Sequence, residues 1–375
     1  LMQRDVKRVL AYSTVENVGI ITIALGVALS FRTAGENALA SAALLAALLH
    51  STNHAWFKTL LFLGAGSLQR STHTLNLDRL GGLLRGMPFT GAAMLAGSLA
   101  VAALPPFNGF VGEWMLLRSL VGLAASSAGS ASQISALAAL GGLALTGGLA
   151  VACFVRLFGM AFLGLARSDD ARAAIEPSPL MGAVLCGLAL GTLATGVCAA
   201  WIADWLEVVP GGLLGARAVQ VEDQHRIALS SGATISPALL AGLLLLLAPV
   251  PWIVARTAFG PTRRSRGPVW STGLVLQPPM QYTATSFSKP IRLFFHWVLA
   301  PERRIDIEYH DRSPVPRVVR YTGAVPERFE DSVYLPLRAA AIWAAGRLRL
   351  LQNGSVQLYL LYIAVVLVGL LVVTR

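Results

Sequence analysis

The feature that most constrains this chain is a series of apolar runs, each about as long as a helix that crosses a bilayer. A hydrocarbon core about 30 Å thick requires about 20 consecutive apolar residues in a helix. Such runs lie at 9–31, 39–68, 88–123, 134–165, 180–206, 235–259 and 356–373. Because 55% of the residues are hydrophobic and only 13% are charged, we predict an all-α, polytopic membrane helix bundle of about seven spans.

The basic residues lie in the gaps between the apolar runs, and the formal net charge is +11. An excess of Arg and Lys marks the cytoplasmic loops of a membrane protein. Nucleic-acid binding is not expected, because no basic surface interleaved with aromatic residues accompanies the charge. The predicted partner of the apolar runs is therefore the lipid bilayer, in a multi-pass protein of the plasma (inner) membrane.

The run at 88–123 contains two adjacent prolines and has two possible interpretations, two full spans with a tight turn or one discontinuous span. A single crossing places the basic groups near Arg8, Arg79 and Arg167 on one side, whereas two crossings scatter them. We therefore predict one broken helix, a feature that commonly marks the ion site in transporters. The residues predicted to form the break are Pro105, Pro106, Asn108, Gly109 and Gly112.

Ionisable side chains inside an apolar run are costly in a membrane and indicate function. His50, His54 and Lys58 are spaced i, i+4 and i+8, which drifts only about 40° around a helix while rising about 12 Å. These three residues therefore form a ladder on one helix face. Imidazole and amine groups in such a ladder can pass protons when water joins them.

Two acids extend this predicted row. Glu113 follows the break near the start of the second half-helix, where the helix dipole favours the carboxylate and burial favours the neutral acid. Glu16, in the first run, is either a relay residue or a structural partner of Lys58 or Arg8. The residues predicted to transfer protons are Lys58, Glu113, His54, His50 and Glu16, with Lys58 and Glu113 as the principal pair. The alternative for each histidine is a hydrogen-bonded packing role.

No metal, redox centre or cofactor is expected in this chain, and no catalytic residue is assigned. Cys153, Cys186 and Cys198 all lie within apolar runs, without a Cys-x-x-Cys motif that could hold an iron–sulfur cluster. The two histidines of the ladder lack the adjacent Glu of a zincin motif. Arg156, inside the run at 134–165, is interpreted as a side chain that snorkels to the membrane surface.

Composition divides the chain into four predicted parts. Residues 1–165 form a transmembrane repeat that carries the ionisable row, and 166–259 add further transmembrane helices. Residues 260–352 are a cytoplasmic arm rich in proline and arginine. Its part at 260–331 is predicted to be irregular and to lie on partner subunits or lipid headgroups, because so many prolines exclude a long helix. Within this arm, 332–351 form either an amphipathic interfacial helix or a flexible linker. Residues 353–375 are a C-terminal transmembrane helix. The chain begins at Leu1 without a visible signal peptide, so we expect a piece of a longer protein.

Three motifs, in this order, resemble the antiporter-like subunits of respiratory complex I and its relatives. They are DVKRVLAYST at 5–14, HAWFKTLLFL at 54–63, and LP at 104–105 followed by GF at 109–110 and Glu113. Within that superfamily, STVENVG at 13–19 and MQYTATSF at 280–287 are most similar to hydrogenase-4 component B and the formate hydrogenlyase membrane subunit. The resemblance is strong over 1–165.

The resemblance implies a fold of two inverted repeats, of which this chain contains the second. It also implies that His50, His54 and Lys58 belong to a central hydrophilic axis, with Glu113 as the outer proton-transfer residue at the broken helix. The distal antiporter-like subunit of complex I has Lys where this chain has Glu113, so the direction of coupling does not carry over. The implied partners are the other membrane and hydrophilic subunits of a hydrogenase-type complex.

The sequence thus predicts a proton-translocating, antiporter-like membrane subunit of a hydrogenase-4 or formate hydrogenlyase type complex. Redox chemistry would take place in the partner subunits. The alternatives are a subunit of a multisubunit cation/proton antiporter, the corresponding subunit of NADH:quinone oxidoreductase, and a structural membrane anchor whose ion path is inactive.

Overall fold

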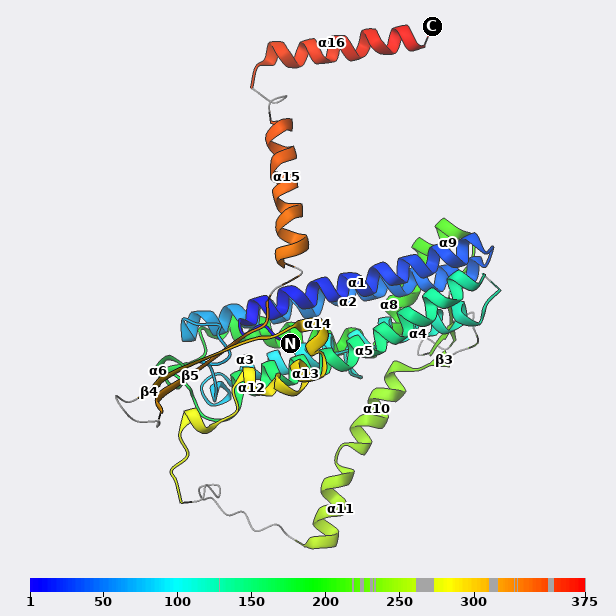
Figure 1. Ribbon diagram of the computed structural model, residues 1–375. Helices are drawn as coiled ribbons and strands as arrows, with labels where there is room; N and C mark the ends of the chain where they lie inside the picture. The colour runs from blue at the N-terminus through cyan, green and yellow to red at the C-terminus, as the bar shows by residue number, and fades with distance from the viewer. Residues whose placement is uncertain are drawn as a thin grey trace. The chain divides into compact units, whose positions relative to one another are not determined.

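The computed structural model describes most of the chain, and helices dominate it (Figure 1). The described residues are 1–127, 129–217, 219–222, 226–229, 232, 234–260, 273–309, 316–326, 328, 330–349 and 354–374. The chain divides into two compact units, Leu1–Pro290 and Ile291–Arg375, and each unit is described by itself.

Two long helices, α1 (Val6–Thr33) and α2 (Asn37–Thr72), organise the first unit. α1 begins where the Asp5 carboxylate accepts a hydrogen bond from the Arg8 N–H at 3.0 Å, which satisfies one free donor of the first turn. The chain reverses at Gly35, whose φ of 81° favours glycine. α1 and α2 then pack against each other over much of their length.

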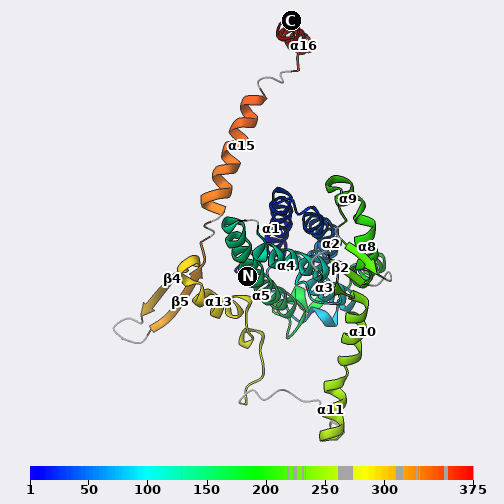
Figure 2. The same ribbon diagram turned by 90° about the vertical axis from the view of Figure 1, so that its right-hand side faces the viewer.

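The predicted broken span is present as α3 (Pro88–Val101) and α4 (Gly109–Ala125), joined by residues 102–108. Both helices pack along α2, whereas they contact each other only sparsely. α5 (Ser130–Phe162) packs against both of them, and the helices α1 to α5 form one bundle (Figure 2). The two half-helices therefore follow one another along the same pair of neighbours.

Contacts at the end of α5 decide between one crossing and two. The Arg167 guanidinium donates to the Leu80 carbonyl at 2.9 Å, and the Gly82 N–H donates to the Leu163 carbonyl at 3.0 Å. The chain after α5 therefore returns to the end of the bundle at which α2 finishes. Since α5 crosses once, α3 and α4 together must also cross once. The discontinuous span predicted from the charge distribution is confirmed.

The predicted span at 180–206 ends earlier than expected. α7 (Pro179–Val197) begins at Ser178, whose side chain accepts from the Met181 N–H, and it stops at Cys198. The next helices, α8 (Ala199–Leu206) and α9 (Val208–Leu214), pack against α2 instead. The chain changes direction here because the small residues of α8 are buried in the bundle.

The predicted span at 235–259 is also divided. α10 (Pro237–Leu247) and α11 (Val250–Phe259) are separated by a turn at Pro249. Proline interrupts the helix because it lacks the N–H that an internal helical position donates. Before these helices lies a three-stranded antiparallel sheet. Its strands are β1 (Val219–Glu222), β2 (Arg226–Leu229) and β3 (Thr234–Ile235).

Five segments among the described residues are long and apolar enough to cross a membrane. They are α1, α5, α7, the α10–α11 pair (Pro237–Phe259) and α16 (Val356–Val373). α2 and the broken α3–α4 pair complete the seven predicted spans. Large apolar side chains are exposed along these helices, as expected for surfaces that face lipid. The prediction of a polytopic membrane helix bundle is confirmed.

The expectation of an irregular arm is wrong for part of 260–331. β4 (Glu302–Tyr309) and β5 (Pro316–Ala324) form an antiparallel hairpin in which Ile305 pairs with Tyr321. In the sequence, Ile305 and Ile307 alternate with charged neighbours, which is a strand pattern, but the many prolines of the arm argued against regular structure.

The remaining short elements are η1 (Leu83–Arg85), α6 (Asp169–Ala173), η2 (Pro278–Met280), α12 (Ala284–Phe287), α13 (Lys289–Phe294), α14 (His296–Leu299) and η3 (Glu330–Tyr334).

Of the two alternatives for 332–351, the structure has a helix, α15 (Leu335–Leu348). Its location at the membrane surface stays a prediction. The prolines and arginines of the arm that fall within 261–272 and 310–315 lie outside the described residues.

Two glycines of α7 provide a test of the packing around the broken span. At Gly196 an added Cβ would clash with the Pro106 carbonyl, whereas at Gly187 it would meet no atom within 4 Å. We expect Gly196→Ala to destabilise the protein by about 1–3 kcal/mol through overpacking. Gly187→Ala should be neutral or stabilising by about 0.5–1 kcal/mol, because alanine is the better helix former. Thermal unfolding of the purified complex measures both, and equal melting temperatures for the two variants would contradict this packing.

Candidate proton-transfer axis

The three ladder residues lie on one face of α2, inside the bundle. His50 and Lys58 are 2% and 6% exposed, and His54 is half-buried. The Phe57 ring packs edge-on against both imidazoles, at centroid distances of 6.4 and 5.5 Å. The ladder therefore packs against an aromatic ring inside the bundle, and His50 and Lys58 contact bulk solvent little.

α1 supplies the polar partners of this ladder. The Lys58 Nζ donates to the Leu10 carbonyl at 3.1 Å and to the Ser13 hydroxyl. Further along, the His50 Nε2 pairs with the Asn17 Oδ1 at 3.1 Å. Ser13 and Asn17 are buried and lie one turn apart, on the side of α1 that faces α2.

Sequence reasoning did not nominate Ser13 or Asn17 as site residues. The signal was the cluster of polar residues at 13–17 inside an apolar run, with the spacing i, i+4 that places both on one helix face. Polar side chains of this kind satisfy a buried amine or imidazole, which otherwise pays a large desolvation cost.

The broken span is fastened to the middle of α2 by two asparagines. The Asn53 Nδ2 donates to the Asn108 carbonyl at 2.7 Å, and the Asn108 Nδ2 donates to the Asn53 carbonyl at 3.4 Å. α7 binds the same residue from another side, where the Asn108 N–H donates to the Thr192 carbonyl at 3.2 Å. The backbone exposed by the Pro105–Pro106 break thus finds partners on two helices. Asn53 was not nominated from the sequence, although it lies between the two ladder histidines.

Gly112 explains how the half-helix α4 approaches the ladder so closely. An added Cβ at this position would lie 3.0 Å from the His50 Cβ and 3.1 Å from the His50 Nδ1. A side chain at this position would therefore require His50 to move, and glycine leaves room for the histidine beside the break. Glu113, the next residue, is half-buried near the start of α4.

Four buried polar atoms around the break have no hydrogen-bond partner among the described residues. They are the His50 Nδ1, Asn53 Oδ1, His54 Nε2 and Asn108 Oδ1. Buried polar groups are nearly always paired, with protein or with water. Donors and acceptors grouped in this way form a region in which water can bind and link the imidazoles.

The structure brings the five predicted proton-transfer residues together. Glu16 lies within electrostatic range of Lys58 and of Glu113, and Lys58 lies within range of His54. The network therefore joins α1, α2 and α4, with the acids Glu16 and Glu113 on α1 and α4 and the bases His50, His54 and Lys58 on α2. The part that each residue plays in proton transfer stays a prediction. Within the described ranges, no group of three or more His, Cys, Asp or Glu side chains could hold a metal ion.

Comparison with known proteins shows which proteins the chain resembles. The family model for the transmembrane region of NADH:quinone oxidoreductase and Mrp antiporters matches residues 1–138. Hydrogenase-4 component B of Escherichia coli (strain K12) is 35% identical over 379 residues, covering 99% of this chain and 56% of that protein. Residues 1–138 therefore match the antiporter-like family, and the whole chain is similar to a part of a hydrogenase-4 membrane subunit.

Other relatives show the same similarity. Formate hydrogenlyase subunit 3 of Escherichia coli (strain K12) is 36% identical over 302 residues, covering 80% of this chain and 47% of that protein. The chain spans about half the length of the curated relatives it matches. A chain of the membrane-bound sulfane sulfur reductase, an archaeal respiratory membrane complex, shares the fold with a TM-score of 0.58 at 18% identity. That match covers 96% of this chain and 55% of the other.

The asparagine pair provides a test of the geometry of the axis. Asn53→Ala removes the donor to the Asn108 carbonyl and leaves a buried acceptor unpaired, which should cost about 1–3 kcal/mol of stability. The matched control is Ser51→Ala on the same helix, because the Ser51 hydroxyl donates only to the Ala47 carbonyl of its own helix. Thermal unfolding of the purified complex compares the two variants. If they lose the same stability, the asparagine pair does not hold the break to α2.

Proposed function

We propose that this antiporter-like subunit translocates protons in a hydrogenase-4 or formate hydrogenlyase type complex of the inner membrane. The observation that supports the proposal is the buried row of ionisable side chains that runs along α2 and meets the broken span. A row of this kind is expensive inside apolar helices, and a proton pathway accounts for it.

Proton transfer along the row would use groups that can hold and release a proton in turn. Lys58 and His50 are about 12 Å apart along the helix axis, too far for direct transfer. His54 lies between them, and the unpaired atoms of Asn53 and Asn108 can bind the water that bridges the gaps. Glu113 then takes the proton at the break, where α4 begins.

Coupling would arise from the electrostatic contact between neighbours in the row. When Lys58 is protonated, its charge disfavours a second charge on His54 and favours the ionised form of Glu16. A charge change in a partner subunit would shift the first member, and each member would then shift the next. Redox chemistry in the partner subunits supplies the energy in this proposal, and the chain itself needs no redox centre.

A second candidate is a subunit of a multisubunit cation/proton antiporter. The matching family model supports it, because its description covers Mrp antiporters as well as NADH:quinone oxidoreductase. This candidate predicts that a sodium gradient alone drives proton movement, without a redox partner. The hydrogenase-type proposal predicts that proton movement requires turnover of the partner's redox substrate.

Substitution of the principal pair tests the proposal. We expect Lys58→Ala and Glu113→Gln each to reduce substrate-driven acidification of vesicles by about 100-fold, since each removes a group that must carry the proton. The complex must first be shown to assemble with normal amounts of its partner subunits. Matched controls are Lys7→Ala and Glu36→Gln, which remove the same charges from exposed positions.

Normal proton translocation in both the Lys58 and Glu113 variants would contradict the proposed function. Acidification driven by a sodium gradient in the absence of redox substrate would favour the cation/proton antiporter instead.

A further inference from the structure

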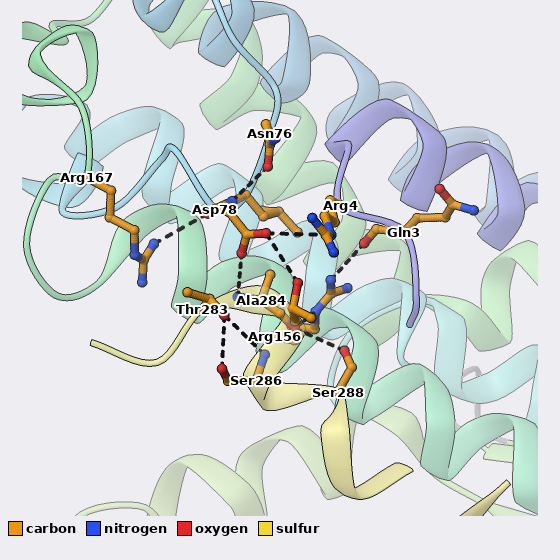
Figure 3. Close-up of polar contacts among 12 residues, drawn as sticks. Gln3, Arg4, Asn76, Asp78, Arg156, Arg167, Thr283, Ala284, Ser286 and Ser288 are labelled. Carbon is orange, nitrogen blue, oxygen red and sulfur yellow. Dashed lines mark hydrogen bonds and ion pairs between the residues drawn. The ribbon is translucent and has the colours of Figure 1, made fainter. Parts of the chain in front are cut away.

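Residues 281–288 dock onto the end of the bundle where α2 and α5 finish (Figure 3). This docked segment includes α12 and lies within the first compact unit, whose last residue is Pro290. The segment comes from the stretch that the sequence predicts to be an irregular arm, and the ion pathway described above does not involve it.

Two charged side chains bind the backbone of the docked segment. The Ala284 N–H donates to the Asp78 Oδ1 at 2.8 Å, and the Ala284 carbonyl accepts from the Arg156 Nε at 2.9 Å. The Thr285 hydroxyl donates to the other Asp78 oxygen at 3.3 Å. Ala284 is fully buried, so the site is matched to a small side chain at this position.

Flanking contacts extend the docking over the whole segment. The Gln281 amide accepts from the Leu165 N–H at 2.9 Å, and the Tyr282 carbonyl accepts from the Arg167 Nη2 at 3.1 Å. At the far end, the Ser288 hydroxyl donates to the Leu1 carbonyl at 3.0 Å. Because these partners lie at the start and in the middle of the first unit's sequence, the segment holds separate parts of the bundle together.

Arg156 connects the docked segment to the start of α1, the helix whose Leu10 carbonyl and Ser13 hydroxyl bind the Lys58 amine. Besides Ala284, it donates from Nη2 to the Gln3 carbonyl at 2.8 Å, just before α1 begins. The side chain is 1% exposed, so the expectation that it snorkels to the surface is wrong. Carbonyl groups of two segments keep the guanidinium inside, where a buried charge needs hydrogen-bond partners.

Two helices, α1 and α5, both lie beside Lys58. Its amine binds the Leu10 carbonyl and the Ser13 hydroxyl on α1. On α5, Cys153 lies one turn before Arg156 and within electrostatic range of both Lys58 and Arg156. Arg156 therefore fixes α1 relative to α5 close to Lys58.

The charged side chains around the docked segment would also have partners if the segment left its site. Asp78 and Arg156 have opposite charges and lie within electrostatic range of each other, yet both bind the segment. If the segment left, Asp78 would keep its ion pair with Arg4 at 3.7 Å, and Arg156 would keep its hydrogen bond to the Gln3 carbonyl. The two side chains could then also pair directly with each other. Asp78 and Arg156 thus have hydrogen-bond or ion-pair partners in both the docked and the undocked arrangement.

We propose that residues 281–288 form a latch, and that Arg156 is a positioning residue through which the docked latch sets the arrangement of α1 and α5 around Lys58. Release of the latch changes the surroundings of the Lys58 amine and thereby proton transfer. The latch itself follows from the contacts above, whereas its effect on proton transfer rests on the proposed function.

Chemical labelling in the assembled complex tests whether the latch is docked. Ser288→Cys is nearly isosteric and buried, whereas Ser286→Cys is exposed and reports full access. Cys186 and Cys198 are replaced by alanine, and the buried Cys153 is kept. A membrane-impermeant maleimide should label Ser288→Cys about tenfold more slowly than Ser286→Cys, a ratio equivalent to about 1.4 kcal/mol. Equal labelling rates would overturn the docked latch.

Forced undocking tests the link to Lys58. Ala284→Leu has no room for its larger side chain and should raise the labelling of Ser288→Cys about tenfold. The matched control, Tyr282→Phe, changes a side chain that is 73% exposed and should leave labelling unchanged. Proton translocation in Ala284→Leu should fall, and its pH dependence should move by about one unit. The titratable groups that face Lys58 are Glu16 on α1, His54 on α2 and Cys153 on α5.

Variants of Arg156 distinguish an effect on the arrangement of α1 and α5 from a general loss of folding. Arg156→Gln should displace the pH dependence as Ala284→Leu does. Arg156→Lys keeps the charge but offers one nitrogen for two carbonyls, so it should give an intermediate displacement. Faster labelling with an unchanged pH dependence in all three variants would overturn the positioning role. If the unmodified complex translocates no protons, the proposed function fails, and labelling alone decides whether the latch exists.

Discussion

The structure depends on how a buried amine is accommodated inside a bundle of apolar helices. Lys58 is 6% exposed, and its amine is bound by a carbonyl and a hydroxyl of α1. An amine removed from water without such partners would strongly destabilise the fold. This requirement explains why α1 has a polar face toward α2, with Ser13 and Asn17 one turn apart, while its other faces are apolar.

The broken span meets the same physical requirement in a different way. Its unwound backbone would be costly in lipid, so it lies against α2 and α7, where Asn53 and the Thr192 carbonyl pair with Asn108. Glycines at 112 and 196 allow this close approach, because a side chain at 196 would clash with the Pro106 carbonyl and one at 112 would crowd His50. The ladder histidines and Glu113 are thereby brought to one region, together with unpaired polar atoms that can bind water.

At the opposite end of the row from the break, charged side chains again meet buried backbone. Arg156 and Asp78 bind the backbone of residues 281–288 rather than pairing only with other side chains. At the break and at residues 281–288, the side chains of Asn53, Asp78 and Arg156 thus satisfy buried main-chain groups. Lys58 and its neighbours lie between these two places.

The sequence by itself determined the features that depend on the length of apolar runs, on helical spacing and on the charges of the loops. Apolar runs of the right length required a membrane bundle, helical spacing put His50, His54 and Lys58 on one face, and the charges of the loops required one crossing at Pro105 and Pro106. Only the tertiary structure decided which groups satisfy that row. Asn17 opposite His50, Asn53 opposite Asn108 and Arg156 beneath residues 281–288 are pairings between residues from 33 to 128 positions apart. No local pattern encodes such pairings, because they depend on how helices pack and which buried atoms would otherwise be left without a partner.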